Sequence, residues 1–219
     1  LTLYGKLDIM WFDGGQEVIA INEIRELQPG ILVNPRMHGY GDFETPETRF
    51  PEKPIEGWWE MCDIWHRASW GYQTSAEAYK PASWMLSNLV RVRSWGGNFL
   101  PNVGPRPTGE MPDAYYREMA TIGEWMKVNS ESVFGVQQGP SAGRANVPVT
   151  VRPGTSYLFL LPRFDETVVI DVVAKPAAVE MLDGHSALPF TVENGRLNID
   201  VSRTARSGSV DVIRVTWRK

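Results

Sequence analysis

Hydrophobic residues in the first part of the chain fall into short continuous runs separated by a helix-like spacing. The runs at residues 7–12 and 31–33 are too short for helices and are typical of strands buried on both faces. Between them, four apolar residues recur near a 3.6-residue period, and Pro29 with Gly30 then ends the repeat. They are Val18, Ile21, Ile24 and Leu27. These patterns predict a β-α-β unit whose helix, at residues 16–27, packs on a sheet.

The alternation of strands and helices continues to about residue 129. The predicted elements are, in chain order, a strand at 58–65, a helix at 80–95, a strand at 99–103 and an amphipathic helix at 112–129. Pro81 suits a first helical turn, and Gly96 suits the end of that helix. Residues 35–57 have the Pro and Gly content of a loop, and loops of that length are uncommon without a function. We therefore expect an active-site loop there.

From about residue 136 the sequence changes to short β-branched runs between turn signals. The predicted strands are 147–151, 157–161, 167–173, 179–182, 197–201 and 210–217. The dipeptides Asp183-Gly184 and Asn194-Gly195 are of the kind that join hairpin strands. We therefore expect two domains, an α/β domain at residues 1–135 and an antiparallel β-sandwich at residues 136–219.

Composition narrows the classes of partner. With 219 residues, 42% of them hydrophobic, the chain can build a substantial core. A formal net charge of -4 without blocks of Lys or Arg argues against a nucleic-acid groove or an anionic membrane surface. The single cysteine, Cys62, cannot form an intrachain disulfide, and no metal-ligand spacing occurs, so we expect no metal and no cofactor.

No apolar run approaches the roughly 18 residues of a membrane span, and the first residues lack the apolar stretch of a signal peptide. The sequence therefore predicts a soluble protein and leaves periplasmic, secreted and cytoplasmic locations open.

A carboxylate stands where the first apolar run ends. Asp13 precedes Gly14 and follows Trp11 by two residues. In parallel α/β folds the working residues sit at the carboxyl ends of strands, whereas an Asp before Gly-Gly is also an ordinary turn signal. The residues alone leave both interpretations open.

Residues 5–15 resemble the nucleophile strand of the α-L-fucosidases, the retaining glycosidases of glycoside hydrolase family twenty-nine. Three further segments support the resemblance, in the order of that family. They are Gly-Asp-Phe-Glu-Thr-Pro-Glu at 41–47, Trp-Glu-Met-Cys at 59–62 with Ser-Trp-Gly-Tyr at 69–72, and Gly-Gly-Asn-Phe-Leu-Pro-Asn-Val-Gly-Pro at 96–105. The chain therefore resembles the C-terminal part of such an enzyme.

The resemblance implies a partial (β/α) TIM-like barrel that lacks its N-terminal half, followed by the β-sandwich. It implies hydrolysis of terminal α-L-fucosyl groups of a fucosylated glycan or small fucoside by double displacement, without metal or cofactor. Asp13 would be the nucleophile and Glu47 the acid/base, with Glu60 as the alternative. The implied substrate-binding residues are Trp11, Arg36 and Trp70.

Members of this family normally carry several barrel strands before the nucleophile strand. Their upstream sugar-binding side chains have no counterpart here, and His38, His66 and His185 match no motif that would replace them. A partial barrel leaves a strand edge unpaired and apolar faces open to water. We therefore expect self-association or a companion N-terminal fragment, unless upstream residues simply lie outside this sequence. The alternative function is an inactive carbohydrate-binding or structural remnant.

Overall fold

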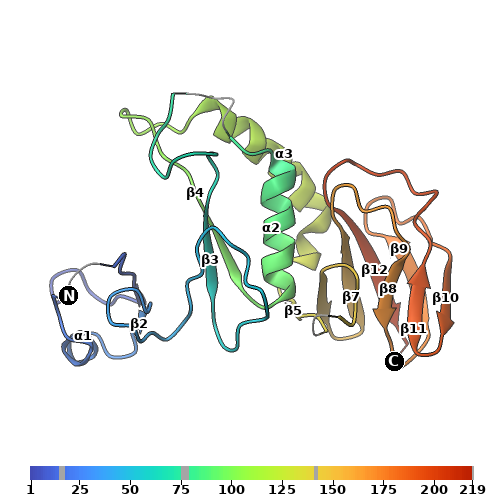
Figure 1. The fold of residues 1–219 in the computed structure, drawn as a ribbon, viewed down its shortest axis with the longest axis horizontal. Helices are drawn as coiled ribbons and strands as arrows, with labels where there is room; N and C mark the ends of the chain where they lie inside the picture. The colour runs from blue at the N-terminus through green and yellow to red at the C-terminus, as the bar shows by residue number, and fades with distance from the viewer. Residues whose placement is uncertain (15–17, 75–78, 141–142, 219) are drawn as a thin grey trace.

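Parallel strand pairs form the N-terminal part of the chain in a computed structural model, which describes residues 1–14, 18–74, 79–140 and 143–218. Strand β1 (Ile9–Met10) pairs with β2 (Leu32–Val33), and β3 (Glu60–Ile64) pairs with β4 (Asn98–Asn102). In Figure 1, β2 lies near the N-terminus, apart from β3 and β4, which lie next to α2. These short strands correspond to the runs predicted at 7–12, 31–33, 58–65 and 99–103.

The segment 42–48 connects the two strand pairs, although the sequence predicts only a loop there. On one side, the backbone N–H of Asp42 donates to the carbonyl of Val33 at 2.8 Å. On the other side, the N–H of Cys62 donates to the carbonyl of Pro46 at 3.0 Å, and parallel bridges pair Glu44 with Trp59 and Glu47 with Cys62. The predicted loop therefore contains a strand-like stretch that runs beside β3.

Helix α1 (Ile21–Leu27) is shorter than predicted. Ile24 is fully buried against Ile31 and Val33, as the periodicity requires. Val18 precedes the helix and is exposed, and Leu27 is also exposed, so the prediction that both belong to its buried face is wrong. Residues 16 and 17 of the predicted helix lie outside the described residues. A helix this short is maintained by the packing of Ile24, because its own hydrogen bonds are too few.

Two longer helices follow the prediction closely. Helix α2 (Ala82–Ser94) starts after Pro81, and helix α3 (Asp113–Asn129) continues into a 3₁₀ turn at Ser130–Ser132. The carboxylate of Glu118 on α3 accepts a hydrogen bond from the N–H of Ala82 at 2.8 Å. It satisfies one of the unpaired N–H groups at the start of α2.

Antiparallel sheets make up the C-terminal part. The five-stranded sheet has the order β5 (Gln137–Gln138), β6 (Val149–Arg152), β7 (Thr155–Leu160), β12 (Asp211–Trp217) and β9 (Pro176–Met181). The three-stranded sheet has the order β10 (Phe190–Glu193), β11 (Arg196–Ile199) and β8 (Val168–Asp171). Leu158 and Ile213 of the first sheet share a hydrophobic cluster with Leu197 of the second. Asn194 and Gly195 join β10 to β11 with positive φ angles of 52° and 74°, as the turn dipeptide predicts.

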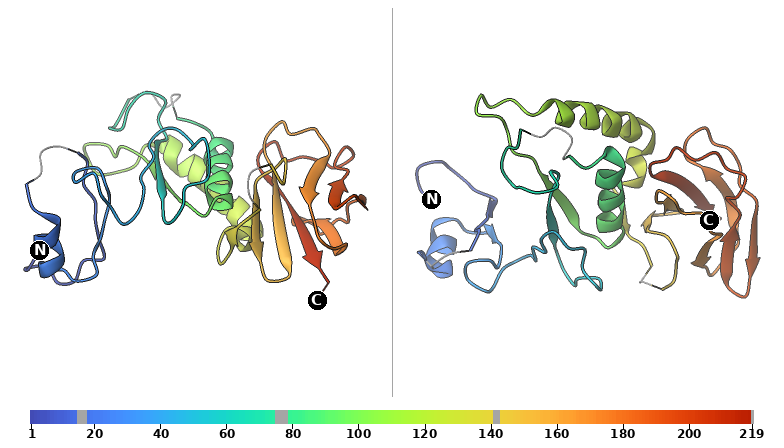
Figure 2. Two further views of the ribbon diagram at one scale, coloured as in Figure 1. Left: turned by 60° about the horizontal axis from the view of Figure 1, so that its bottom comes forward. Right: turned by 45° about the horizontal axis from the view of Figure 1, so that its top comes forward.

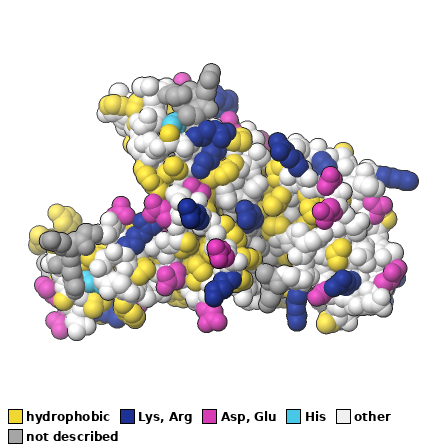
Figure 3. All heavy atoms as spheres, viewed as in Figure 1, with side chains coloured by type: hydrophobic (Ala, Val, Ile, Leu, Met, Phe, Trp, Pro, Cys, Tyr) yellow, Lys and Arg dark blue, Asp and Glu magenta, His cyan; other side chains and the backbone are white. Residues whose placement is uncertain are grey.

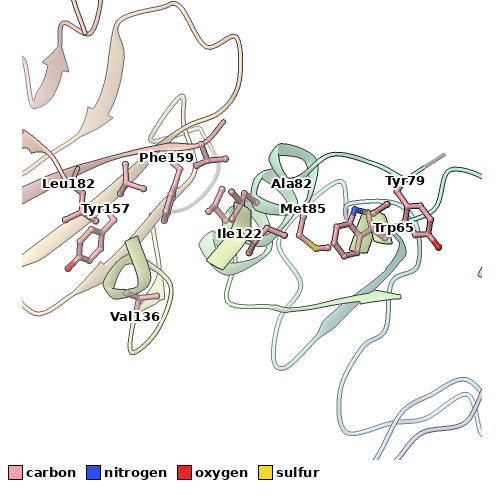
Figure 4. Packing of buried hydrophobic residues seen from close by; sticks show 14 residues of the cluster. Trp65, Tyr79, Ala82, Met85, Ile122, Val136, Tyr157, Phe159 and Leu182 are labelled. Atoms are coloured by element: carbon pink, nitrogen blue, oxygen red, sulfur yellow. The ribbon is translucent and has the colours of Figure 1, made fainter. Parts of the chain in front are cut away.

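A second hydrophobic cluster joins the helical part to the five-stranded sheet. Figure 4 shows Met85 and Ile122 of the two long helices on one side and Tyr157 and Phe159 of β7 on the other. The expected domain boundary, between residues 135 and 136, falls within this cluster, because Val136 belongs to it. The parts on either side of it are therefore packed together.

The molecule is elongated, with its two termini at opposite ends (Figure 2). The β1–α1–β2 unit lies apart from the helices α2 and α3, and extended segments connect it to them. Charged side chains of both signs are interspersed over the face seen in Figure 3. Among the described residues, no helix is both long and apolar enough to cross a membrane.

Candidate active site

The two-residue period of the strands separates an outer from an inner face. Met61 of β3 and Trp59, which directly precedes the strand, pack with Val92 of α2 on the outer face. Cys62 points to the opposite face because successive side chains of a strand alternate. It lines a cavity of about 500 Å³ together with Leu100, its partner residue on β4. The other lining residues are Trp11, Asp13, Arg36, Glu47, Trp70, Pro101, Asn102 and Val103.

Asp13 and Glu47 meet at Arg36 within this cavity. The Nη1 atom of Arg36 lies 3.1 Å from Oδ1 of Asp13 and also forms an ion pair with Oε2 of Glu47. The nearest oxygens of the two carboxylates are therefore within two hydrogen-bond lengths of each other. Glycosidases that retain anomeric configuration use carboxyl groups about 5 to 5.5 Å apart. The arrangement is compatible with one carboxyl group attacking a sugar carbon while the other serves its leaving oxygen.

Arg36 is held from several sides. Its Nε donates to Oγ1 of Thr45 at 3.1 Å, and its Nη2 donates to the Thr45 carbonyl at 3.2 Å. The guanidinium also lies 4.5 Å from the ring centroid of Trp11, within range of a cation–π contact. The Arg36 side chain is only 19% exposed, whereas that of Asp13 is 84% exposed. A fixed cation thus stands beside a carboxylate that a substrate can approach.

The backbone that carries Asp13 is anchored by Asn34. The N–H of Phe12 donates to Oδ1 of Asn34 at 2.7 Å, and Nδ2 of Asn34 donates to the Phe12 carbonyl at 2.8 Å. Asn34 is fully buried. Sequence reasoning missed this residue, although its place directly after the apolar run 31–33 was the available signal. It fixes the end of β1 to the end of β2.

Glu60 lies away from Asp13. It is the first residue of β3, at the amino end of the strand, and it lines a smaller cavity with Ile9 and Trp58. It does not line the cavity of Asp13 and Glu47. The geometry therefore favours Glu47 over Glu60 as the second carboxyl group.

Trp70 also lines the cavity, on a loop that rests against Gly104. A Cβ atom at position 104 would lie 2.2 Å from the backbone nitrogen of Tyr72. Only glycine permits this close approach, so Gly104 helps to hold the Trp70 loop over the carboxyl end of β4.

The wall of the cavity contains Cys62 and Asn102, which sequence reasoning did not assign to it. Burial raises the pKa of the Cys62 thiol, and the negative charge of Glu47 raises it further. Two buried polar atoms, Nε1 of Trp11 and Oδ1 of Asn102, have no hydrogen-bond partner among the described residues. Unpaired buried polar atoms are uncommon and suit a site that receives a polar ligand.

The three histidines take no part in the lining of this cavity. His38 packs edge-on against the ring of Phe12, with centroids 5.4 Å apart. His66 is buried, and its Nδ1 accepts a hydrogen bond from the N–H of Ala68. His185 lies 3.3 Å from Nη2 of Arg214 on the C-terminal sheet. Within the described ranges, no three His, Cys, Asp or Glu side chains are grouped as metal ligands.

Comparisons with known proteins agree with one another. A family model described as Alpha-L-fucosidase matches residues 1–131. Human tissue alpha-L-fucosidase is 30% identical over 148 residues, which cover 59% of this chain and 32% of the relative. Rat plasma alpha-L-fucosidase is 33% identical over 98 residues, which cover 43% of this chain and 21% of the relative. The chain thus spans about a third or less of the length of these relatives.

Solved structures give the same result for the fold. Alpha-L-fucosidase isoenzyme 1 from Paenibacillus thiaminolyticus matches with a TM-score of 0.82 and 24% identity, over 99% of this chain and 59% of that chain. An alpha-L-fucosidase from Bacteroides thetaiotaomicron, a trapped covalent intermediate in complex with 2-fluoro-fucosyl fluoride, matches with a TM-score of 0.73 and 20% identity. That match covers 90% of this chain and 51% of the other.

Proposed function

The chain belongs to the α-L-fucosidase family, and on that premise we propose that it hydrolyses terminal α-L-fucosyl groups with retention of anomeric configuration. The substrate is a fucosylated glycan or a small fucoside. One observation carries the proposal: Asp13 and Glu47 contact the same nitrogen of Arg36 in one cavity. The trapped covalent intermediate of the Bacteroides thetaiotaomicron relative supports a covalent route.

In the first step, a carboxylate oxygen of Asp13 attacks the anomeric carbon of the fucosyl group. The bond from that carbon to the leaving oxygen breaks, and Glu47 in its protonated form, in which it no longer pairs with Arg36 as an anion, transfers its proton to this oxygen. Asp13 suits the attacking role because its side chain is open to the cavity. The product of this step is a fucosyl ester on Asp13 and a free leaving group.

In the second step, the Glu47 carboxylate takes a proton from water while the water oxygen attacks the anomeric carbon. The ester bond to Asp13 breaks, so that Asp13 is again a carboxylate and Glu47 again carries a proton. Two displacements on opposite faces restore the original configuration at the anomeric carbon. No metal or cofactor is required by this scheme.

Arg36 and the two tryptophans have supporting roles in the proposal. Arg36 neutralises part of the charge on Asp13 and orients it, because the guanidinium is fixed by Thr45 and Trp11. Trp11 and Trp70 contribute flat apolar surfaces to the cavity, on which the C–H faces of a sugar can rest.

We further propose that residues 1–135 are part of a (β/α) barrel and that residues 136–219 form a β-sandwich. The inner face of the parallel strands is open, since Ile9 is 56%, Trp58 68% and Leu100 43% exposed. Exposed apolar side chains on one sheet face indicate a surface that another segment covers. We propose that a second copy, a companion chain or further residues of the same polypeptide close this face.

The enzymatic proposal is tested by hydrolysis of an aryl α-L-fucoside, with Asp8→Asn as the control for Asp13→Asn. Like Asp13, Asp8 is an exposed aspartate of the first segment of the chain. Among the described residues, its carboxylate forms an ion pair only with Lys6. We expect Asp13→Asn to lower kcat/KM by at least about 10³-fold, because it removes the nucleophile, and Asp8→Asn to leave it unchanged. Equal activity of the two variants would contradict the proposal. Fucose binding without turnover would instead favour the inactive remnant.

Closure of the open face is tested by native mass spectrometry of the active species. We expect a mass above the 24.7 kDa of residues 1–219. Turnover by a species of 24.7 kDa would refute the closure proposal and leave the enzymatic one standing.

A further inference from the structure

A second cavity lies behind the sheet, on the side away from Asp13. It has a volume of about 340 Å³, within the range of small-molecule sites, and shares no lining residue with the catalytic cavity. Arg91 and Trp95 contribute from the end of α2, Phe50 from the long loop, and Pro148 and Val149 from the C-terminal sheet region. Phe50 and Trp95 pack against the outer-face cluster of Trp59. The cavity is therefore built where the two parts of the chain meet.

Arg91 and Arg93 lie two residues apart on α2 but differ in their partners. Both are half-buried, and desolvation lowers the pKa of both guanidinium groups. Arg93 donates to the carbonyls of Val133, Gly97 and Val136 at 3.4, 2.9 and 3.4 Å. The Arg91 guanidinium has no hydrogen-bond acceptor and no ion-pair partner within the ranges that the structure describes. A guanidinium that burial has partly removed from water and that lacks an acceptor in the protein can gain free energy by hydrogen-bonding to a ligand.

The described residues around Arg91 are aromatic or uncharged, and none of those that line the cavity carries a negative charge. Its guanidinium carbon lies 4.4 Å from the ring centroid of Phe50, and the rings of Phe50 and Trp95 are tilted with centroids 4.6 Å apart. A cation–π contact uses the positive charge of Arg91 but none of its N–H donors. Arg91 is the one charged residue among those that line the cavity, on a chain whose formal net charge is -4. An anion entering here meets an unpaired cation and no repelling carboxylate from the cavity wall.

We propose that this cavity binds a small organic anion, a six-membered ring that carries one carboxylate. The carboxylate accepts the free N–H groups of Arg91, whose planar fork matches its two oxygens. The ring lies against Phe50 and Trp95, which offer flat apolar surfaces. An acidic sugar and an aromatic acid share this chemistry. The proposal is independent of the catalytic one, since no residue of the Asp13 cavity takes part.

The test is a titration followed by NMR at the indole N–H of Trp95. The probes are methyl glucopyranosiduronic acid for the sugar source and benzoate for the aromatic source, with neutral methyl glucopyranoside as the control ligand. We expect at least one acid to shift the Trp95 signal saturably, and the neutral glycoside not to do so. The tighter of the two acids identifies the source.

The variants separate this site from the catalytic one. We expect Arg91→Gln to weaken binding of the acid by at least about tenfold, as loss of a charge-assisted pair requires. Arg196→Gln, which removes an exposed arginine of β11, and Asp13→Asn should both bind like the wild type. If Arg91→Gln does not fold, Arg91→Lys retains the charge without the fork and should bind more weakly than the wild type.

Three results would overturn the proposal. The first is that neither acid shifts the Trp95 signal in the wild type. The second is that the arginine variant that folds, Arg91→Gln or Arg91→Lys, binds as tightly as the wild type. The third is that Asp13→Asn abolishes binding, which would place the acid in the catalytic cavity.

Discussion

Replacing Asn34 by Ala should loosen the end of β1 that carries Asp13. The substitution removes both hydrogen bonds to the backbone of Phe12, at 2.7 and 2.8 Å. Because Asn34 is fully buried, water does not readily replace the lost amide. Leaving a buried donor or acceptor unpaired costs about 1–3 kcal/mol for each group. For the Phe12 N–H and C=O together that rule gives about 2–6 kcal/mol, and we expect a loss of about 3 kcal/mol, in the lower half of that range.

Asn146 provides a matched control. Its Nδ2 donates to the carbonyl of Thr167 at 2.8 Å, and its Oδ1 accepts from the N–H of Val169 at 2.8 Å. The pattern is the same as at Asn34, but Asn146 is exposed. Water can therefore satisfy both backbone groups in Asn146→Ala. We expect that variant to lose less than about 1 kcal/mol, the net value of a typical hydrogen bond.

Native-state hydrogen exchange measures the difference where it occurs. In Asn34→Ala the amide of Phe12 should exchange about 100-fold faster than in the wild type, which corresponds to about 3 kcal/mol. In Asn146→Ala the amide of Val169 should change by less than about tenfold. Similar acceleration in both variants would refute the argument that burial decides the cost.

Three further predictions concern single groups. Cys62 should react with iodoacetamide more slowly at pH 7.5 than free cysteine does, because the pKa of its thiol is raised. Glu47→Gln should speed this reaction, because it removes a negative charge beside the thiol. The rate of alkylation, followed by intact mass as a function of pH, checks both. Burial raises the pKa of Tyr157 to about 12. The neutral phenol therefore contributes fully to the stability of the folded state below pH 10, and this contribution is lost as pH rises through 12. In Tyr157→Phe, the free energy of unfolding measured by denaturant titration should no longer show this decrease between pH 9 and 12. Glu118→Ala should cost about 1 kcal/mol in urea unfolding, whereas Glu118→Gln keeps an acceptor for Ala82 and should cost less.

The sequence predicted best where periodicity is long. The helices α2 and α3 start and end within a few residues of the predicted ranges 80–95 and 112–129. At α1 the same periodicity overextended the helix, because Val18 fits the spacing by chance and makes no buried contact. Strand β10 was missed since Phe190–Glu193 is a four-residue edge strand with alternate exposed residues. Short strands depend on their neighbours more than on their own sequence.

The candidate site shows the same limit. The resemblance supplied Asp13, Glu47 and Arg36, which line one cavity, but it left Glu60 as an alternative. The structure separates the two glutamates because Glu60 is at the amino end of β3, whereas Glu47 lies beside Cys62 further along the strand. That distinction depends on the register of segment 42–48 against β3. No local pattern in the sequence encodes that register.

The central claim is that Asp13 forms the covalent bond to the sugar. The most direct measurement is to treat the active species with 2-fluoro-fucosyl fluoride and locate the label by peptide mass spectrometry. The account predicts a single fucosyl adduct on Asp13, and none in Asp13→Asn. A label on another residue, or continued turnover of an aryl fucoside with Asp13 unlabelled, would contradict it.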